Sequence, residues 1–194
     1  LVFSSQKNIK INFAEIGILD NKSIKCWRNY FSKAKIFAFE FDKKMISNAK
    51  KDNLNDVVYS QIDVKNENSI KLAFEKTKVL FDIIIDDGSH LSKDVKKSFE
   101  LLFPVLKNKG LYVVEDIQTS YNHFFGGNPF DLKYSNSHMN FFKHLTDRLN
   151  YQEIANPFYI SHKYDAKITN VSFYHNLVFV RKGVNDKISK EVLK

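Results

Sequence analysis

The sequence predicts an α/β fold, with a doubly wound, mostly parallel sheet and an antiparallel hairpin near the C-terminus. Short apolar runs rich in Ile, Val and Phe alternate with segments of helical periodicity as far as Val114. Strands that alternate with helices form parallel sheets through right-handed crossovers. Two further β-rich runs, residues 167–173 and 177–182, flank a three-residue turn, which is typical of a hairpin that closes one edge of the sheet.

The first half of the chain supplies strands that end near acidic residues. Residues 9–16 carry Glu15 and are followed by Gly17, residues 35–41 carry Glu40, and residues 57–62 are followed by Asp63. Gly17 would let the backbone approach a ligand closely, although a plain turn is the alternative and the glycines of a dinucleotide fingerprint are absent. An acid at the end of the second strand commonly binds ribose hydroxyls; the alternative is a cap for the next helix. The expected helices cover residues 23–31, 43–51 and 68–76.

The central unit of the chain is a strand–helix–strand segment from Phe81 to Tyr121. It reads FDIIIDDGSH, then a stretch of helical periodicity, then GLYVVEDIQTSY. Apolar residues at spacings of four and three predict the helix (Val95, Phe99, Leu102 and Leu106), with Ser92 as its N-cap. We expect Pro104 to bend or end this helix early and Gly110 to mark the turn into the following strand.

Both strands of the central unit finish in a pair of acids, Asp86 with Asp87 and Glu115 with Asp116. Parallel strands end at the same edge of a sheet, where open α/β folds bind ligands. Four carboxylates repel one another unless a cation lies among them, and oxygen ligands favour Mg²⁺ or Ca²⁺. His90, on the loop after the first of these strands, is within reach of the same edge. The alternative is that the acids are helix caps or solvated loop residues, and His90 an ordinary polar loop residue.

The segment after Asp116 is rich in aromatic residues and His, and it contains a Gly126-Gly127 turn. Because it leaves the acidic edge directly, we expect a substrate wall or lid at about residues 117–150. Tyr121 and His123 are the candidates for the pocket. The second half of the segment is expected to join the core, because its apolar residues have helical spacing (Phe141, Phe142, Leu145 and Leu149).

Length and composition predict a single domain over residues 1–194. No apolar run approaches the ~18 residues of a membrane span. The single Cys26 and the lack of a signal-peptide pattern favour a reducing, cytoplasmic compartment, and the missing initiator Met suggests a trimmed N-terminus. The formal charge of +8 does not predict a nucleic-acid partner, because the lysines are spread along the chain. The charged tail, residues 185–194, is expected to be a surface or frayed helix.

The order of these elements resembles the class I S-adenosylmethionine-dependent methyltransferases, which implies a Rossmann-like methyltransferase fold. The motifs IDDGSH and LFPVLKNKGLYVVEDIQTSY resemble those of the metal-dependent bacterial sugar O-methyltransferases, including the macrolide deoxysugar type. This resemblance implies that Asp87, Glu115 and Asp116 bind Mg²⁺ and that His90 is the general base. It also implies a cofactor site, made of Glu15, Gly17, Glu40, Asp86 and, near the adenine, Gln61 and Asp63.

Two departures from that family are visible. Asn21-Lys22 stands where the family often has Gly-Gly, which could narrow the methionine end of the cofactor pocket. The chain also begins after the N-terminal segment with which the family covers its cofactor, so we expect a trimmed chain or a more open site.

The resemblance implies an enzyme that transfers a methyl group from S-adenosylmethionine to a sugar hydroxyl, with Mg²⁺ as second cofactor. The sugar would belong to a nucleotide sugar, a surface polysaccharide or a glycoside. A metal lowers the pKa of a bound hydroxyl, and a nearby His can take its proton. The alternatives are a metal-dependent methyltransferase for catechol-like small molecules and a non-catalytic, methyltransferase-like binding module. We expect a carbohydrate or small-molecule partner and no nucleic acid; a homo-oligomer is left open.

Overall fold

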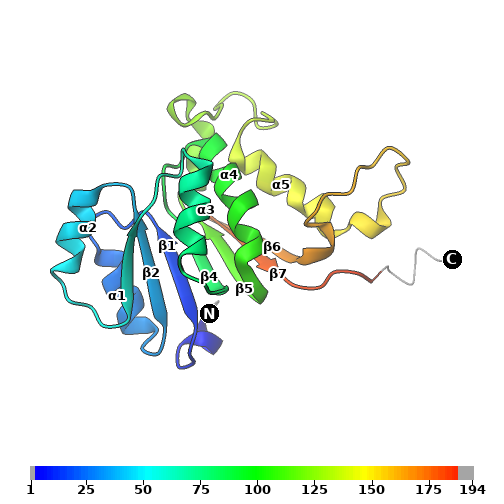
Figure 1. The fold of residues 1–194 in the computed structure, drawn as a ribbon. Helices are drawn as coiled ribbons and strands as arrows, with labels where there is room; N and C mark the ends of the chain where they lie inside the picture. Colours follow the sequence, from blue (N-terminus) through cyan, green and yellow to red (C-terminus); the bar gives the residue numbers. More distant parts are fainter. Residues whose placement is uncertain (1–2, 188–194) are drawn as a thin grey trace.

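The computed structural model describes residues 3–187, which form one seven-stranded sheet in the order β3-β2-β1-β4-β5-β7-β6 (Figure 1). Strands β1 to β5 run parallel, and β7 pairs antiparallel with both β5 and β6. The predicted fold class is therefore confirmed, including the hairpin at one edge of the sheet.

The strands and helices begin and end within a few residues of their predicted positions. The strands are β1 (Asn12–Ile16), β2 (Lys35–Glu40), β3 (Val57–Gln61), β4 (Phe81–Asp86), β5 (Leu106–Val114), β6 (Ile168–Tyr174) and β7 (Leu177–Lys182). The α-helices are α1 (Lys22–Tyr30), α2 (Lys43–Lys50), α3 (Glu67–Glu75), α4 (Ser92–Leu102) and α5 (His138–Leu149). Of the predicted tail helix, residues 185–187 are not helical, and residues 188–194 lie outside the described residues.

Side chains from the sheet fill a hydrophobic layer on each of its faces. Ile84 and Tyr112 are buried with Phe99 on the face covered by α3, α4 and α5, of which α3 and α4 lie side by side in Figure 1. Ile83 and Val113 are buried on the opposite face, with residues of α1 and α2. Because neighbouring residues on a strand point to opposite faces, the apolar runs read from the sequence are what a doubly covered sheet requires.

The start of α4 differs from the prediction. Ser92 is the first helical residue rather than the N-cap, a position taken by Leu91 without a side-chain hydrogen bond. The Ser92 hydroxyl is engaged elsewhere, because it lies 2.9 Å from Nδ1 of His138. The helix ends at Leu102 and passes into a short 3₁₀ helix that contains Pro104, so the prediction of an early end is confirmed.

The prediction for Gly110 is wrong, because this glycine lies inside β5 rather than before it. The strand already begins at Leu106, and its pairing with β4 shifts register between Phe81 and Ile83. A Cβ on Gly110 would lie 2.8 Å from the carbonyl oxygen of Lys107. The glycine therefore permits an irregularity within the strand, which the sequence cannot distinguish from a turn.

The segment after β5 crosses the edge of the sheet and returns to the core. It begins as a 3₁₀ helix (Ile117–Tyr121), and the N–H of Ile117 donates to the carbonyl oxygen of Asn176 at the tip of the β6–β7 hairpin (3.1 Å). Phe142 and Leu145 of α5 are buried, as predicted for the second half of this segment. A lid can therefore involve only the part before α5, residues 117–137, and for that part it stays a prediction.

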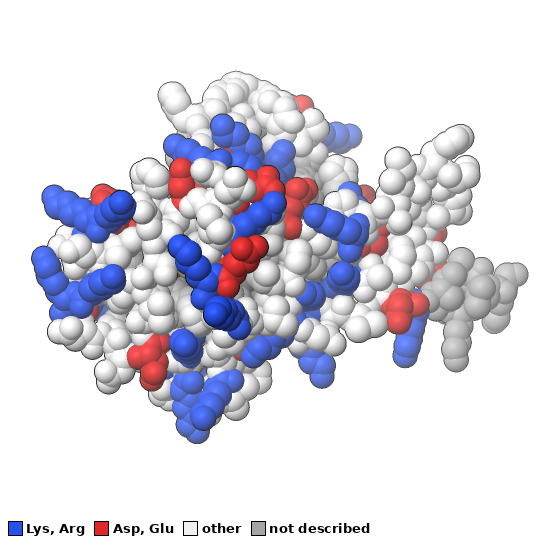
Figure 2. Space-filling model, viewed as in Figure 1, with Lys and Arg blue, Asp and Glu red and all other residues white. Residues whose placement is uncertain are grey.

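Basic side chains are scattered over the face shown in Figure 2, among acidic and uncharged ones. On that face the basic side chains do not gather into one patch. Within the described residues, no helix is both long and apolar enough to span a membrane.

Gly17, directly after β1, allows an unusually close approach of two turns. Its φ is +84°, and a Cβ would lie 2.1 Å from the carbonyl oxygen of Asp87. We expect Gly17→Ala to lower the free energy of unfolding by more than about 2 kcal/mol, because left-handed strain and a backbone clash add together.

Gly126→Ala is the matched control for this prediction. Gly126 also has a positive φ (+73°), but a Cβ there would meet only Cβ of Ser92, at 3.7 Å. Gly126→Ala should therefore lower the free energy of unfolding by only about 1 kcal/mol, from backbone strain alone. Urea unfolding measures both variants, and equal losses would show that the approach of Gly17 to Asp87 is not tight.

Candidate active site

A cavity of about 490 Å³ lies at the carboxyl ends of β1 to β5, where open α/β sheets bind ligands. Half of the predicted site residues line it, namely Gly17, Glu40, Asp63, Asp87, His90 and Asp116. The others lie outside its lining, namely Glu15, Gln61, Asp86, Glu115, Tyr121 and His123. The structure therefore gathers predicted residues from five strand ends around one cavity.

Glu40 holds the loop after β1 against the end of β2. Its Oε2 accepts hydrogen bonds from the backbone N–H groups of Ile18 and Leu19, at 3.0 and 3.1 Å. Its Oε1 accepts from the N–H groups of Phe41 and Asp42, at 2.8 and 3.0 Å. The N-cap of α2 is Asp42, so Glu40 is not that cap. Glu40 organises the loop and lines the cavity at the same time.

Asn21 stabilises the same loop from inside the protein. It is buried and left-handed (φ 67°), a conformation that Asn tolerates better than most residues. Its Nδ2 donates to Oδ2 of Asp52 (2.9 Å) and to the hydroxyl of Tyr59 (3.0 Å). Neither Asn21 nor Lys22 lines the cavity. The pair that departs from the family's Gly-Gly therefore lies outside the lining of the cavity.

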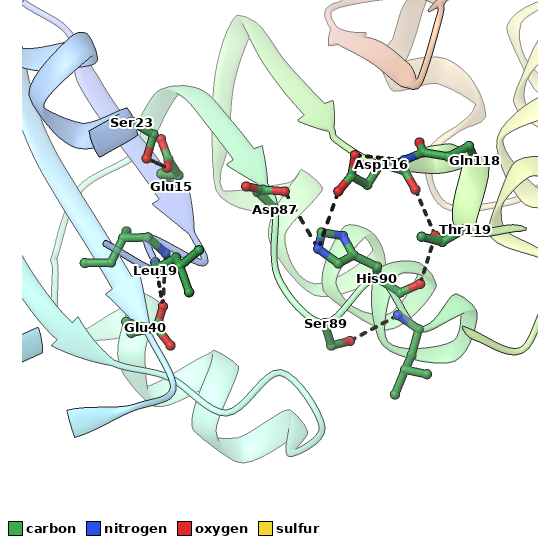
Figure 3. A network of polar contacts seen from close by, with 12 residues as sticks. Glu15, Leu19, Ser23, Glu40, Asp87, Ser89, His90, Asp116, Gln118 and Thr119 are labelled. Carbon is green, nitrogen blue, oxygen red and sulfur yellow. Dashed lines mark hydrogen bonds and ion pairs between the residues drawn. The ribbon is translucent and has the colours of Figure 1, made fainter. Parts of the chain in front are cut away.

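Glu15 is buried at the end of β1, beside α1. It accepts a hydrogen bond from the Ser23 hydroxyl (Figure 3). Burial raises the pKa of Glu15 to about 7, although the hydrogen bond from Ser23 acts in the opposite direction. Its Oε2 has no hydrogen-bond partner among the described residues. Buried polar atoms are normally paired, so this oxygen fits a further donor.

The two acids at the end of β4 have different surroundings. Asp86 is turned into the core beside β5, where the Tyr112 hydroxyl donates to its Oδ2 (3.0 Å) and burial raises the pKa of Asp86 to about 7. Asp87 faces the cavity instead. Its burial, followed by the charges of Glu115 and Asp116, raises the pKa of Asp87 to about 8. Asp86, which was expected in the cofactor site, therefore does not line the cavity, because the side chains of adjacent strand residues point in opposite directions.

Glu115 and Asp116 follow directly after the end of β5. The N–H of Glu115 continues the sheet by donating to the carbonyl oxygen of Asp86 (3.0 Å). Its side chain is half-buried, and this burial, followed by the charge of Asp116, raises the pKa of Glu115. Asp116 is left-handed (φ 53°), and the chain turns there into the 3₁₀ helix Ile117–Tyr121.

His90 lies between the ends of β4 and β5. Its Nε2 is 3.9 Å from Oδ1 of Asp87 and 3.8 Å from Oδ2 of Asp116 (Figure 3). The ring of Phe125 lies edge-on to the imidazole, with 6.4 Å between ring centroids. Burial lowers the pKa of His90, and the charge of Asp116 opposes that effect. An imidazole between two carboxylates is suited to accepting a proton.

The remaining predicted residues lie near the rim of the site. Asp63 lines the cavity, and its Oδ1 accepts from the N–H of Lys65 (2.9 Å). Gln61 lies outside the lining and donates from Nε2 to the carbonyl oxygen of Phe41 (3.0 Å). Tyr121 and His123 are exposed on the segment after Asp116. The structure does not bring these two side chains into the cavity.

The donor set of the acidic edge fits a hard divalent cation. Asp87, His90 and Asp116 each offer a ligand atom, and these atoms lie within 4.8 Å of one another. Glu115 is not part of this group, but its charge is the strongest of the neighbouring charges that raise the pKa of Asp87. A bound cation would reduce the repulsion between carboxylates that hinder one another's ionisation in this way. Mg²⁺ prefers oxygen ligands of this kind.

Sequence reasoning missed a hydrogen-bonded group behind His90. It consists of Thr119, the buried ring of His138 and the hydroxyl of Ser92. Its contacts join residues between 19 and 46 positions apart, so no local pattern reveals them. The excess of His and aromatic residues after Asp116 is the one signal that pointed to this region.

Comparison with known proteins agrees with this geometry, although no protein-family model matches the chain. The chain is 32% identical over 193 residues to the demethylmacrocin O-methyltransferase of Streptomyces fradiae, covering 95% of this chain and 47% of that protein. It is 33% identical over 194 residues to the 8-demethyl-8-alpha-L-rhamnosyl tetracenomycin-C 2'-O-methyltransferase of Streptomyces olivaceus, covering 94% and 48%.

Among solved structures, the MycE methyltransferase from the mycinamycin biosynthetic pathway is similar to this chain. Its complex with Mg, SAH and mycinamycin VI matches with a TM-score of 0.84 and 28% identity, covering 98% of this chain and 51% of that one. The chain thus spans about half the length of the relatives it matches.

The strand order and these similarities place the chain in the Rossmann-like class I methyltransferase fold. Within that class it is a homologue of the bacterial sugar O-methyltransferases of macrolide and tetracenomycin glycosides. The family resemblance predicted from the two acidic motifs is therefore confirmed.

We expect Glu40→Ala to lower the free energy of unfolding by about 1–3 kcal/mol, because four backbone N–H groups lose a charged acceptor. Glu75→Ala is the matched control, since Glu75 is an exposed carboxylate at the end of α3. The control should stay within about 0.5 kcal/mol of the parent protein. Urea unfolding measures both changes, and a loss for Glu40→Ala no larger than the control would exclude its role in holding the loop.

Proposed function

We propose that this protein transfers a methyl group from S-adenosylmethionine to a sugar hydroxyl of a glycoside, with Mg²⁺ at the acidic edge. The observation that carries the proposal is the convergence of Asp87, His90 and Asp116 at a cavity that extends to Gly17 and Glu40. Support comes from MycE, whose structure contains Mg and SAH, the product that remains when S-adenosylmethionine has lost its methyl group.

S-Adenosylmethionine supplies an electrophilic methyl group on a sulfonium centre when it is bound. Gly17 would allow its close approach to the backbone after β1, and Glu40 is placed at the end of β2 for the ribose hydroxyls. Because the Glu40 oxygens already accept four N–H groups, any ribose contact shares this carboxylate with the loop. Asp63, at the end of β3, would lie near the adenine.

Three other residues of the proposed cofactor site would act from outside the cavity. Glu15 offers its unpartnered Oε2 from the buried end of β1. Gln61 supports the rim through the carbonyl oxygen of Phe41. Asp86 ties the end of β4 to Tyr112 of β5 and so orients the adjacent Asp87.

Asp87, Glu115 and Asp116 would hold the Mg²⁺, and His90 would stand beside it rather than bind it. Oxygen ligands suit Mg²⁺ better than imidazole does. The cation supplies charge that lowers the pKa of a nearby hydroxyl. Held between two carboxylates, the imidazole of His90 would then take the proton of the acceptor hydroxyl.

The acceptor is proposed to be a glycoside rather than a nucleotide sugar or a polysaccharide. The relatives named above are methyltransferases of macrolide and tetracenomycin glycosides, which does not favour a role in polysaccharide synthesis. Residues 117–137, with Tyr121 and His123, would form the wall against which this acceptor lies. This wall is tied down by Ser120, whose carbonyl oxygen accepts from the N–H of Asn128 (3.0 Å) and whose hydroxyl accepts from the N–H of Met139 (2.9 Å).

The other candidate functions have less support. A catechol-like acceptor would also use a metal and a base, but both relatives named above act on sugars. A non-catalytic module would not need His90 beside two cavity-lining carboxylates. Methyl transfer from labelled S-adenosylmethionine, assayed against glycosides, catechols and polysaccharide fragments, separates the three. Transfer to none of them would contradict the proposed function.

Turnover should require the metal. We expect excess EDTA, or Asp87→Asn, to abolish methyl transfer, because the acceptor hydroxyl loses the charge that lowers its pKa. The Kd of S-adenosylmethionine should change less than about threefold, since Asp87 is proposed to serve the metal. Radiolabel transfer and calorimetry measure the two effects. Asp63→Asn, on the opposite side of the cavity, is the control and should keep its response to Mg²⁺. Full activity in EDTA would remove the metal from the proposal.

Loss of the base should affect turnover rather than metal binding. We expect His90→Ala to lower kcat by about 10² to 10⁴, the usual range for a general base, while Mn²⁺ still binds. His144→Ala, an exposed imidazole on α5 paired with Asp147, is the matched control and should leave kcat unchanged. Steady-state kinetics measure kcat for both variants. An unchanged kcat in His90→Ala would mean that another residue is the base.

A further inference from the structure

Two residues of the site, His90 and Asp116, are held in the same uncommon backbone conformation. Their φ angles are 56° and 53°, in the left-handed region that non-glycine residues rarely adopt. Their side chains also approach each other, with His90 Nε2 3.8 Å from Asp116 Oδ2. Strained backbone at a site persists only where surrounding contacts hold it.

The hydroxyl of Thr119 contacts the backbone of both residues. Its Oγ1 lies 2.8 Å from the carbonyl oxygen of Asp116 and 3.2 Å from the carbonyl oxygen of His90 (Figure 3). Carbonyl oxygens only accept hydrogen bonds, so the single hydroxyl proton must point towards this pair. One side chain therefore links the loop after β4 to the turn after β5.

A buried imidazole lies behind this hydroxyl. The ring of His138, the first residue of α5, is fully buried, with Nε2 3.5 Å from Thr119 Oγ1 and Nδ1 2.9 Å from Ser92 Oγ. Burial, followed by the charges of His90 and Lys96, lowers the pKa of His138 to about 4, so the ring is neutral at pH 7.

The directions of these hydrogen bonds fix the tautomer of His138. Because the Thr119 proton is committed to the carbonyl oxygens, its Oγ1 must accept from the imidazole, which places the ring proton on Nε2. Nδ1 then accepts from the Ser92 hydroxyl, while Ser92 Oγ faces the backbone N–H of His138 at 3.4 Å. Each group in the chain from Ser92 to Asp116 thus has one consistent role.

We infer that Thr119 is a positioning residue for the transfer reaction, supported by His138, and that its hydroxyl fixes His90 and Asp116 relative to each other. The inference rests on the proposed function for the roles of those two residues. A hydroxyl bonded to the carbonyl three residues back is common in helical turns, and Thr146 makes such a bond in α5 (2.6 Å). Thr119 differs, because it also reaches a carbonyl 29 residues away and touches a buried ring.

The tautomer provides a test that needs no activity. Long-range ¹H–¹⁵N spectra of the histidine side chains in the metal-free protein should show His138 neutral at pH 7, with its proton on Nε2. Thr119→Val, which keeps the shape but removes the hydroxyl, should shift the His138 and His90 signals. A proton on Nδ1, a doubly protonated ring, or unchanged signals in Thr119→Val would overturn the inference.

Kinetics test the positioning itself. Thr119→Val should lower kcat by about 10- to 100-fold, because small displacements of catalytic groups are costly, while KM for S-adenosylmethionine changes less than about twofold. Thr119→Ser, which restores the hydroxyl, should recover kcat to within about threefold of the parent enzyme. Thr146→Val removes the matched local bond in α5 and should leave kcat unchanged.

The two hypotheses fail differently. An inactive parent protein would contradict the proposed function. The positioning role of Thr119 would then still be tested by the His138 tautomer and by the affinity for Mn²⁺. In that case weaker Mn²⁺ binding by Thr119→Val than by Thr119→Ser supports it, and equal binding overturns it. If the parent is active, equal kcat values for the two Thr119 variants would overturn the inference and leave the proposed function intact.

Discussion

The burial of several carboxylates at one edge of the sheet is the constraint on which the rest of this structure depends. Strands β1, β4 and β5 lie side by side in the sheet and bring their terminal acids together. Burial raises the pKa of Glu15, Asp86, Asp87 and Glu115, because removing their charges from water is costly. Hydrogen bonds from Ser23 and Tyr112 offset this cost for two of the acids, whereas Asp87 lines the cavity.

Much of this arrangement could be predicted from the sequence, because it follows from where strands end. The apolar runs located each strand, and parallel pairing then placed Asp87 and Asp116 at one edge together with Gly17 and Glu40. Local sequence preferences predicted the wrong position for Ser92 in its helix and for Gly110 in its strand, because tertiary contacts override these preferences. A Ser before a helix looks like a cap unless its distant imidazole partner is known, and a glycine inside an irregular strand looks like a turn.

The parts that the sequence could not reveal are those that depend on side-chain direction. Whether Asp86 or Asp87 faces the cavity depends on which of them falls on the outer face of the last pleat. That choice is settled by Tyr112 on the neighbouring strand, which binds Asp86. In the same way, the backbone at Asp116 adopts a left-handed turn, a conformation that no local sequence pattern predicts. Sequence patterns therefore identified the edge but not which oxygens meet there.

The hydrogen bond between Ile117 and the tip of the β6–β7 hairpin has a consequence for the nascent chain. Strands β1 to β5 leave the ribosome before the hairpin does, and until then the outer edge of β5 is unpaired. Open strand edges invite association with other chains, and partly folded proteins are prone to it. Pairing of Val114 with Val178 covers that edge and, a few residues on, supports the backbone next to Asp116. The β6–β7 hairpin thus covers an edge that is prone to aggregation and also supports the backbone beside the acidic edge.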